Sequence, residues 1–511
     1  DKHHIYDAVF DFGSEASQIL CHARDKELGI NDIMPLYGKV KHSYGKELLK
    51  KASEVEQGET NIISEDLRKQ YREQMSKMKI LLLTIDVWND STNGNNCYTN
   101  WFENFDAEFA NIYLGPGVPD NNICTKYFQV SDKMMVRSFW GPKAGRIFEM
   151  DVSVKKQGIN TTSQTVEEYD ANLYKQIKKY ASEPLRLVYD ILWTYGRYDF
   201  KAMQAFIDEF NPDIIFCPHL FSIKSRRIER IIHSMTDVPM VAFTGDVEAS
   251  IKAISYNPLF WIRRLYLASL YGKHVKIFKQ YFTFSASQCK DIQAKYGVPA
   301  EPLYKCVDLG GFQPKKPNKV IRMIYAGRLY CNRWKSISAI GDALKELNKD
   351  VLKAEIYVYS QDHLTKEQEI ALSEDKYIHF MGVTNPANLP KIYKEADIAL
   401  HVESFDKKNM YATMHSFSTK IIDLMASTCA IMAICWDQNN GWNYLKNEDA
   451  AICLSDYSQI LPKLREITEN PRILVDYAYK AYDCGIRNHK REKIQKQLRD
   501  KFNKIVYEQY N

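Results

Sequence analysis

Short apolar runs alternate with amphipathic stretches in two successive series along this chain. The first series contains the runs 80–85, 111–114, 214–217, 240–243 and 281–285, and the second contains 321–326, 354–359, 377–381, 398–402, 430–434 and 451–454. Apolar runs that do not alternate with polar residues predict strands buried on both faces of a sheet. Between them, apolar residues recur near helical spacing at 166–179, 225–234, 336–347, 388–396 and 419–426.

This order predicts an α/β protein with two doubly wound, Rossmann-like domains that face each other across a cleft. The stretch QPKKPNKV at 313–320 has the composition of a linker, so we predict domains over 78–315 and 318–511. Residues 1–74 are polar, with one strand-like run at 6–12, and form an N-terminal extension of unknown role. In doubly wound sheets ligands bind beyond the carboxyl ends of the strands, so residues there are the candidates for function.

Composition narrows the possible partners and the compartment. The formal net charge is only +5, from 69 Lys and Arg against 64 Asp and Glu, which argues against nucleic-acid binding. The eleven cysteines form no C-x-x-C pair, and most lie in apolar runs, so we expect reduced thiols. No stretch approaches the ~20 apolar residues of a membrane span. We therefore expect a cytoplasmic protein.

Two segments of the second series carry candidate phosphate-binding residues. In IYAGRLYCNRWKS a strand ends at Gly327 and Arg328, and Lys335 lies at a helix start. Glycine lets the backbone approach a ligand, arginine offers paired donors to phosphate, and a helix N-terminus favours anions. The alternative is a pair of solvated basic residues in a loop.

In the second segment, FSTKIIDLMA, Ser418 and Thr419 open a helix that carries Lys420 and Asp423. Ser418 is a good N-cap residue, Lys420 has the reach to contact a phosphate, and Asp423 has the chemistry to accept ribose hydroxyls. An ordinary capped helix with an acidic first turn explains the same residues.

Taken together, the two segments resemble the GT-B fold retaining glycosyltransferases of glycosyltransferase group 1, over about residues 78–511. The resemblance implies that Gly327, Arg328 and Lys335 hold the donor diphosphate, and that the helix with Asp423 belongs to the family's Glu-x7-Glu motif. The first acid of that motif falls on His415, with Glu403 as the alternative if 406–413 is an insertion. The resemblance also implies that the backbone of Gly382 and Val383 meets the nucleobase.

In the first series, two positions fit the same family less closely. Gly94 lies in a turn-rich segment where the family has a glycine-rich loop facing the donor. His219 follows the strand at 214–217, where the family often has a histidine near the sugar, although a lone histidine is as often structural.

Residues 257–280 combine aromatic residues with Arg and Lys. That pattern is found in peripheral contacts with an anionic membrane surface, and equally in an ordinary helix packed on a sheet. A peripheral location at the inner face of a membrane therefore stays open.

The expected function is transfer of a sugar from a nucleotide-diphosphate donor to a glycan or lipid-linked acceptor. The resemblance implies retention at the anomeric carbon. The chain has no D-x-D motif to hold a divalent ion, so we expect neither metal nor cofactor, with basic residues stabilising the leaving diphosphate. Two alternatives remain, a nucleotide-sugar epimerase and a non-catalytic nucleotide- or sugar-binding protein of the same fold. The sequence does not specify the sugar, the base, the acceptor or the oligomeric state.

Overall fold

The structure is a computed structural model that describes residues 77–90, 97–150, 183–245, 255–385, 388–414 and 417–510. The extension 1–74 with its strand-like run 6–12, and the helix expected at 166–179, lie outside these residues. The chain forms two compact units, and the larger one, Lys79–Phe105 with Phe109–Arg499, contains most of both sheets. The described part of the smaller unit comprises Lys77, Met78, Asp106–Glu108 and the end of the last helix.

The first sheet has eight strands in the order β4-β3-β2-β1-β5-β6-β7-β8. The strands are β1 Met78–Thr84, β2 Ala107–Tyr113, β3 Lys126–Gln129, β4 Arg146–Glu149, β5 Ile214–Pro218, β6 Met240–Thr244, β7 Gln280–Thr283 and β8 Ala300–Pro302. Strand β4 runs antiparallel to β3, whereas β5 to β8 follow β1 in parallel. The order reverses between β1 and β5, which is the topological switch point of this sheet.

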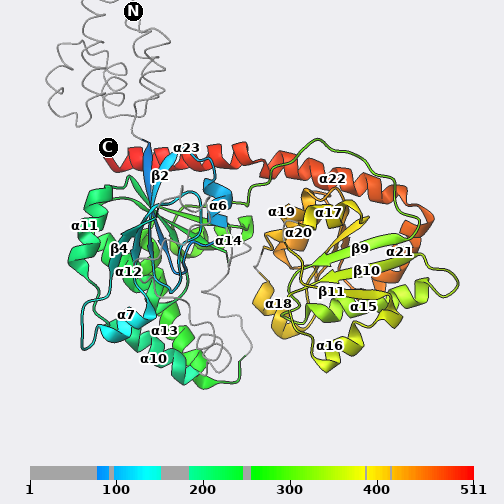
Figure 1. The fold of residues 1–511 in the computed structure, drawn as a ribbon, viewed down its shortest axis with the longest axis horizontal. Helices are drawn as coiled ribbons and strands as arrows, with labels where there is room; N and C mark the ends of the chain where they lie inside the picture. The colour runs from blue at the N-terminus through cyan, green and yellow to red at the C-terminus, as the bar shows by residue number, and fades with distance from the viewer. Residues whose placement is uncertain are drawn as a thin grey trace, which may run out of the picture. The chain divides into compact units, whose positions relative to one another are not determined.

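Helices surround this sheet on both faces (Figure 1). They are α6 Cys97–Phe102, α7 Asp132–Arg137, α10 Glu183–Tyr195, α11 Phe200–Phe210, α12 Ile223–Met235, α13 Pro258–His274, followed by the short η2 Val275–Ile277, and α14 Ala286–Tyr296. Trp101 of α6 is fully buried against the rings of Phe216 and Phe243 from β5 and β6. Strand residues that point to the other face, such as Ile215 and Ala242, join a core with α11 to α14.

The second sheet has six strands, all parallel, in the order β11-β10-β9-β12-β13-β14. The strands are β9 Ile321–Ala326, β10 Ala354–Tyr359, β11 Ile378–Gly382, β12 Ile398–Val402, β13 Ala430–Ile434 and β14 Ile452–Leu454. Numbered by their place in this domain, they run 3-2-1-4-5-6, the order of a Rossmann domain. The switch point lies between β9 and β12.

The remaining helices cover this second sheet and end the chain. They are α15 Arg333–Leu347, α16 Lys366–Ala371, η3 Glu374–Lys376, α17 Leu389–Lys394, α18 Lys407–Thr413, α19 Lys420–Met425, α20 Asn440–Asn447, η5 Tyr457–Gln459, α21 Ile460–Glu469, α22 Arg472–His489 and α23 Arg491–Tyr510. Helices α15 and α21 pack together, as do α19 and α22, and α22 lies against β13. No helix among the described residues is both long and apolar enough to cross a bilayer.

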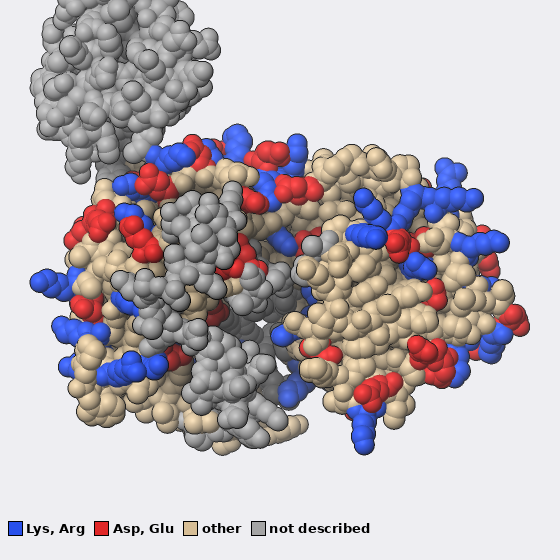
Figure 2. Space-filling model, in the orientation of Figure 1, with Lys and Arg blue, Asp and Glu red and all other residues tan. Residues whose placement is uncertain are grey.

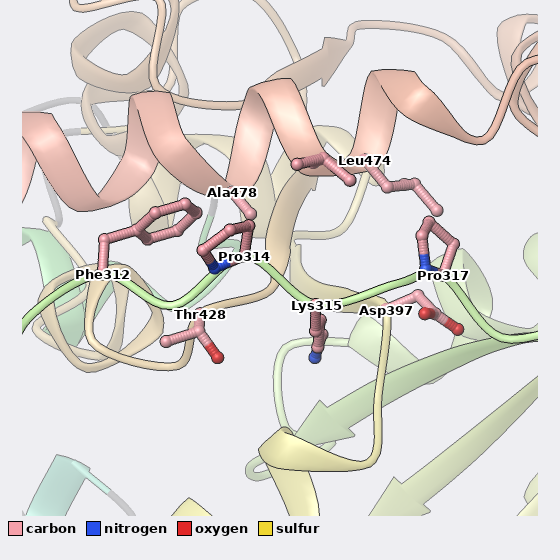
Figure 3. A pocket seen from close by; sticks show the side chains of 9 residues that line it. Phe312, Pro314, Lys315, Pro317, Asp397, Thr428, Leu474 and Ala478 are labelled. Carbon is pink, nitrogen blue, oxygen red and sulfur yellow. The ribbon is translucent and has the colours of Figure 1, made fainter.

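The expected linker is irregular and is held in place along its length. Phe312, Pro314 and Pro317 line a small cavity with Leu474 and Ala478 of α22 (Figure 3). Lys315 points away from α22 in this view, and its Nζ donates to the carbonyl oxygens of Tyr393 and Ala396. The expected linker is therefore packed against helices that cover the second sheet.

The start of α23 returns to residues near the first sheet. Arg491 pairs with Asp308 at 2.6 Å, and Gln495 Nε2 donates to the carbonyl oxygens of Trp101 and Glu103. Acidic and basic side chains are interspersed along α23 on the face that Figure 2 shows, which is a mixed-charge surface and no basic groove.

The expected α/β fold with two Rossmann-like domains is confirmed. The strands expected at 321–326, 354–359, 398–402 and 430–434 have those bounds in the structure, and the others agree within a few residues. Strands β3, β4 and β8 were missed, as were helices α10 and α11. The cleft and the domain limits 78–315 and 318–511 stay predictions.

Candidate functional site

The candidate donor-binding residues gather at the carboxyl edge of the second sheet. Gly327 follows β9, and its amide donates to the carbonyl oxygen of Tyr359 at the end of β10. Tyr359 is in turn in register with Gly382, the last residue of β11. On the other side of the switch point Glu403 follows β12, which pairs with β9. This edge, at a switch point, is where doubly wound sheets bind their ligands.

Gly327 makes room for a lysine of α19. A Cβ placed on Gly327 would overlap Lys420 Nζ, and Nζ donates to the carbonyl oxygen of Ala326 at 3.3 Å. The sequence predicted that this glycine admits a ligand to the backbone. In this structure the space in front of Gly327 holds the Lys420 ammonium, and approach of a ligand to its backbone stays a prediction.

A buried arginine that the sequence analysis missed lies beside this lysine. Arg333 Nη2 and Nε donate to the two Glu403 carboxylate oxygens at 2.6 and 2.9 Å, and both residues are less than a tenth exposed. Paired donors to both oxygens hold the arginine in one orientation. Glu403, one of the two candidates for the family's first acid, is thus fully engaged by Arg333, and its catalytic role stays a prediction.

Lys335 also has an acidic partner in this structure. Its Nζ lies 3.1 and 3.2 Å from the two carboxylate oxygens of Asp406, and Oδ2 of Asp406 also accepts from the side-chain amide of Asn332. The Asn332 amide and the Lys335 ammonium lower the pKa of Asp406. Cys331 and Asn332 adopt φ values of 57° and 58°, a left-handed conformation that non-glycine residues seldom take and that recurs at ligand sites.

A small cavity of about 20 Å³ lies among Arg333, Glu403 and Lys420. Its lining includes Tyr325, Arg333, His401, Glu403, Ser418 and Lys420. It is large enough for a water molecule and too small for a nucleotide. His401 is 6% exposed and its Nε2 has no hydrogen-bond partner among the described residues. Burial, together with Arg333 and Lys420, lowers the pKa of His401 to about 3, so the ring is neutral at pH 7.

Lys420 is the cation whose protonation responds to its surroundings near neutral pH. Burial and the nearby Arg333 guanidinium lower its pKa to about 8, although Glu403 and Asp423 oppose the shift. An anion placed near Nζ would stabilise the charged form.

Arg328, Val383 and Asp423 are the exposed members of the set. Arg328 is exposed at the end of β9, and Val383 is 75% exposed beyond β11. Gly382 has φ of +68°, a conformation that glycine adopts without strain, and the space where its side chain would lie is open. The Gly382 carbonyl oxygen accepts from the Ser360 amide, and contact of this segment with a base stays a prediction.

Asp423 lies in the first turn of α19 and has a partner from an unexpected segment. Lys305 Nζ donates to its two carboxylate oxygens at 2.6 and 2.8 Å. The helix begins one residue later than expected, because its N-cap is Thr419, without a side-chain capping bond, and not Ser418. A hydroxyl at Ser418 therefore does not satisfy the amides of this turn.

His219 lies apart from the second sheet's edge, buried behind β5. Its Nδ1 is 2.9 Å from both carboxylate oxygens of Glu229, which also accepts from Ser225 and contacts His274. Burial alone would raise the pKa of Glu229, but the two histidines lower it to about 2. Two ligands on a tetrahedral zinc with bonds of about 2.0 Å lie about 3.3 Å apart, so the 2.9 Å contacts are those of hydrogen bonds. The catalytic role predicted for His219 stays a prediction.

Gly94 and His415 lie outside the described residues. Of the residues that the sequence analysis missed, Arg333 stands within the same motif as Arg328 and Lys335, and Asp406 and His401 flank Glu403. Arg333 and Lys335 are two residues apart on a helix, so they point to different sides. Because the two side chains lie on different sides of the helix, their spacing indicates that one of them faces the protein interior. Lys305, by contrast, is 118 residues from Asp423, and no local pattern indicates the pair.

Comparison with solved structures confirms the GT-B fold. Sucrose-phosphate synthase from Thermosynechococcus elongatus has a TM-score of 0.52 at 11% identity, over 84% of this chain and 99% of its own. The Anabaena protein HepE in complex with UDP has a TM-score of 0.51 at 12% identity, over 84% of this chain and 100% of its own. The pneumococcal O-GlcNAc transferase GtfA, in complex with UDP and GlcNAc, has a TM-score of 0.51 at 10% identity, over 84% of this chain and 99% of its own.

Two further matches are partial. A chain of the GtfA/B complex and an S. aureus TarM mutant align over 61% and 59% of their own lengths, so this chain spans about three fifths of each. No protein-family model and no curated protein matches the sequence.

Proposed function

We propose that this protein is a glycosyltransferase that moves a sugar from a nucleotide-diphosphate donor to a glycan or lipid-linked acceptor. The observation that carries the proposal is the cluster of four cations, Arg328, Arg333, Lys335 and Lys420, near the β9–β12 switch point. Glu403 and Asp406 are the carboxylates that pair with this cluster, so its formal charge is +2 while Lys420 is protonated. A positive site at this edge suits a diphosphate.

In the proposed reaction, the main role of the protein is to stabilise the leaving nucleoside diphosphate as the glycosidic bond breaks. Preorganised donors aimed at the developing charge supply such stabilisation. We assign this task to Arg328, Lys335 and Lys420, with the amides of Ser418 and Thr419 nearby. The Glu403 carboxylate neutralises and fixes Arg333, so the net positive charge offered to the donor comes from the other cations of the cluster.

The finer parts of the proposal rest on the resemblance to the glycosyltransferase family. They are retention at the anomeric carbon, Gly382 and Val383 beside the base, Asp423 beside the ribose, and a cytoplasmic location. Independence from a metal rests on the lack of a D-x-D motif.

An assay with a panel of nucleotide sugars tests the proposal. The expected result is release of one nucleoside diphosphate that accelerates when a glycan or lipid-linked acceptor is added, and that Arg328→Ala slows. Conversion of the nucleotide sugar to an isomer without any acceptor would instead make the protein an epimerase. Binding of the nucleotide without turnover on any acceptor would make it a non-catalytic protein.

A further inference from the structure

Two neighbouring helices of the first sheet's domain expose a set of large apolar side chains. On α10 they are Leu187, Val188, Ile191 and Tyr195, and on α13 they are Leu259, Ile262, Leu265 and Tyr266, each 39–68% exposed. We call these eight residues the α10–α13 surface. Single exposed apolar residues are common, but a contiguous group of this kind marks a contact site.

The spacing within each helix places these side chains on one side. Val188, Ile191 and Tyr195 follow one another at intervals of three and four, as do Leu259, Ile262 and Tyr266. Residues at such intervals lie on the same face of a helix. The opposite face of α10 is already used, since Trp193 is fully buried and its indole nitrogen donates to Asp132.

An ion pair connects the two apolar rows. Arg263 of α13 donates through Nε to Asp190 of α10 at 2.6 Å. Asp190 directly precedes Ile191, and Arg263 directly follows Ile262. The two rows are therefore adjacent, and the charges between them neutralise each other, so the pair adds no net charge to the surface.

Positive charge surrounds this surface. Helix α12 contacts both α10 and α13. Of the Lys and Arg residues on these three helices, Lys224 is buried and Arg263 is paired with Asp190, whereas Arg186, Arg230 and Lys273 are exposed. On the face drawn in Figure 2, basic side chains gather toward the lower left, where Figure 1 places α7 and α10. An apolar face bordered by cations complements an anionic lipid surface.

We infer that the α10–α13 surface is a docking site for an anionic lipid bilayer, with its apolar side chains entering the interfacial region and the exposed Arg186, Arg230 and Lys273 meeting lipid phosphates. A second copy of this chain fits less well, because it would bring two surfaces of net positive charge together. The inference does not depend on the proposed function, since none of these residues belongs to the donor site.

This surface differs from the one that the sequence suggested. Of the aromatic residues expected in a membrane contact, Tyr271 is buried and shares a hydrogen bond with Tyr281, and the indole nitrogen of Trp261 donates to the carbonyl oxygen of Ser255. Their place is taken by the aliphatic side chains of α13 and by α10, a helix that the sequence analysis did not predict.

Vesicle sedimentation with the full chain tests the inference. We expect binding to vesicles of phosphatidylglycerol and phosphatidylcholine, little binding to phosphatidylcholine alone, and release at high salt. The variant Ile191→Gln/Ile262→Gln should lower partitioning roughly tenfold or more, because two exposed apolar side chains lose their favourable transfer from water to the lipid interface. Both positions are more than half exposed, so the variant should fold, which a thermal melt checks.

The matched control is Ile370→Gln, on α16 of the other domain and 75% exposed, which should bind vesicles like the unchanged protein. Equal partitioning of the double variant and the control would overturn the inference, as would binding that ignores lipid charge. A dimer in light scattering that the double variant dissolves would assign the surface to a second copy of the chain. Wild-type nucleotide binding by the double variant would keep this result separate from the proposed function.

Discussion

Lys420 is the residue through which the donor site should sense pH. Its ammonium occupies the space in front of Gly327 and is partly buried beside Arg333, so its pKa falls to about 8. A lysine that binds an anion must carry its proton, and the bound anion in turn raises the pKa of that lysine. In the free protein Lys420 is therefore mostly charged below about pH 7.5, half charged near pH 8 and largely neutral above about pH 9.

We expect nucleoside-diphosphate affinity to be constant between pH 7 and 7.5 and to fall as the pH rises from about 8 to 9.5. Titration calorimetry across this range measures it. The control is Lys420→Met, which should bind more weakly at pH 7 and show little further decline. Unchanged affinity of the wild-type protein at pH 7 and 9.5 would exclude Lys420 as a contact of the donor.

Asp423 has two possible partners, Lys305 in the structure and a ribose in the proposed complex. Asp423→Asn keeps one acceptor oxygen but places an amide donor where the second oxygen lay. A mismatched polar group in a closed site costs about 1–3 kcal/mol, so donor affinity should fall roughly tenfold. The melting temperature should fall only slightly, because an exposed first-turn acid contributes about 0.3–1 kcal/mol.

Lys305→Met separates these two partners, because it removes the ion pair and leaves the carboxylate in place. If Asp423→Asn and Lys305→Met weaken nucleotide binding equally, the pair matters and the direct ribose contact does not. If both bind like the wild type, Asp423 is only a helix residue.

At the scale of elements, the Arg333–Glu403 pair ties α15 to the end of β12. The two side chains come from positions 70 residues apart and are almost completely buried. Glu403 became a catalytic candidate only through its alignment with the first acid of the family motif, and that role stays a prediction. The sequence indicated its position correctly, but its partner depends on how α15 packs, which local pattern does not specify.

Glu403→Gln should destabilise the protein by about 3–5 kcal/mol, because it leaves the buried Arg333 charge without a carboxylate. Chemical denaturation measures the loss. The double variant Arg333→Met/Glu403→Leu should recover most of the stability, since removing both charges removes the cost of burying one. A Glu403→Gln protein that is as stable as wild type but inactive would show instead that Glu403 takes part in the reaction.

At the scale of the whole molecule, the sequence predicted the fold class well and the site in part. Four strands of the second sheet were placed with their observed bounds, because apolar runs such as IALHV are buried on both faces and have sharp polar ends. Strands β4 and β8 were missed because they are short edge strands with mixed burial. The paired cations Arg333 and Lys335 depend on tertiary contacts to Glu403 and Asp406, and no single-sequence pattern identifies such partners.

At the scale of the whole molecule, one prediction concerns the dependence of activity on a metal ion. Activity should survive treatment with EDTA, because the chain has no D-x-D motif and basic residues are positioned to neutralise the leaving diphosphate. Turnover before and after chelation, with Mg²⁺ and Mn²⁺ added back, provides the measurement. Complete loss with EDTA that either ion restores would contradict the metal-free proposal.

The central claim is that the β9–β12 edge of the second sheet binds a nucleoside diphosphate. Titration of UDP, GDP and ADP into the wild-type protein, Arg328→Ala and Lys335→Ala tests it most directly, with Lys349→Ala as a control at an exposed lysine just beyond the C-terminal end of α15. We expect one nucleotide to bind the wild type and the control equally. Each site variant should lose a charge-assisted contact of about 1.5–3 kcal/mol, roughly a tenfold or greater loss of affinity. Binding that is the same in all four proteins, or absent for every nucleotide, would contradict the claim.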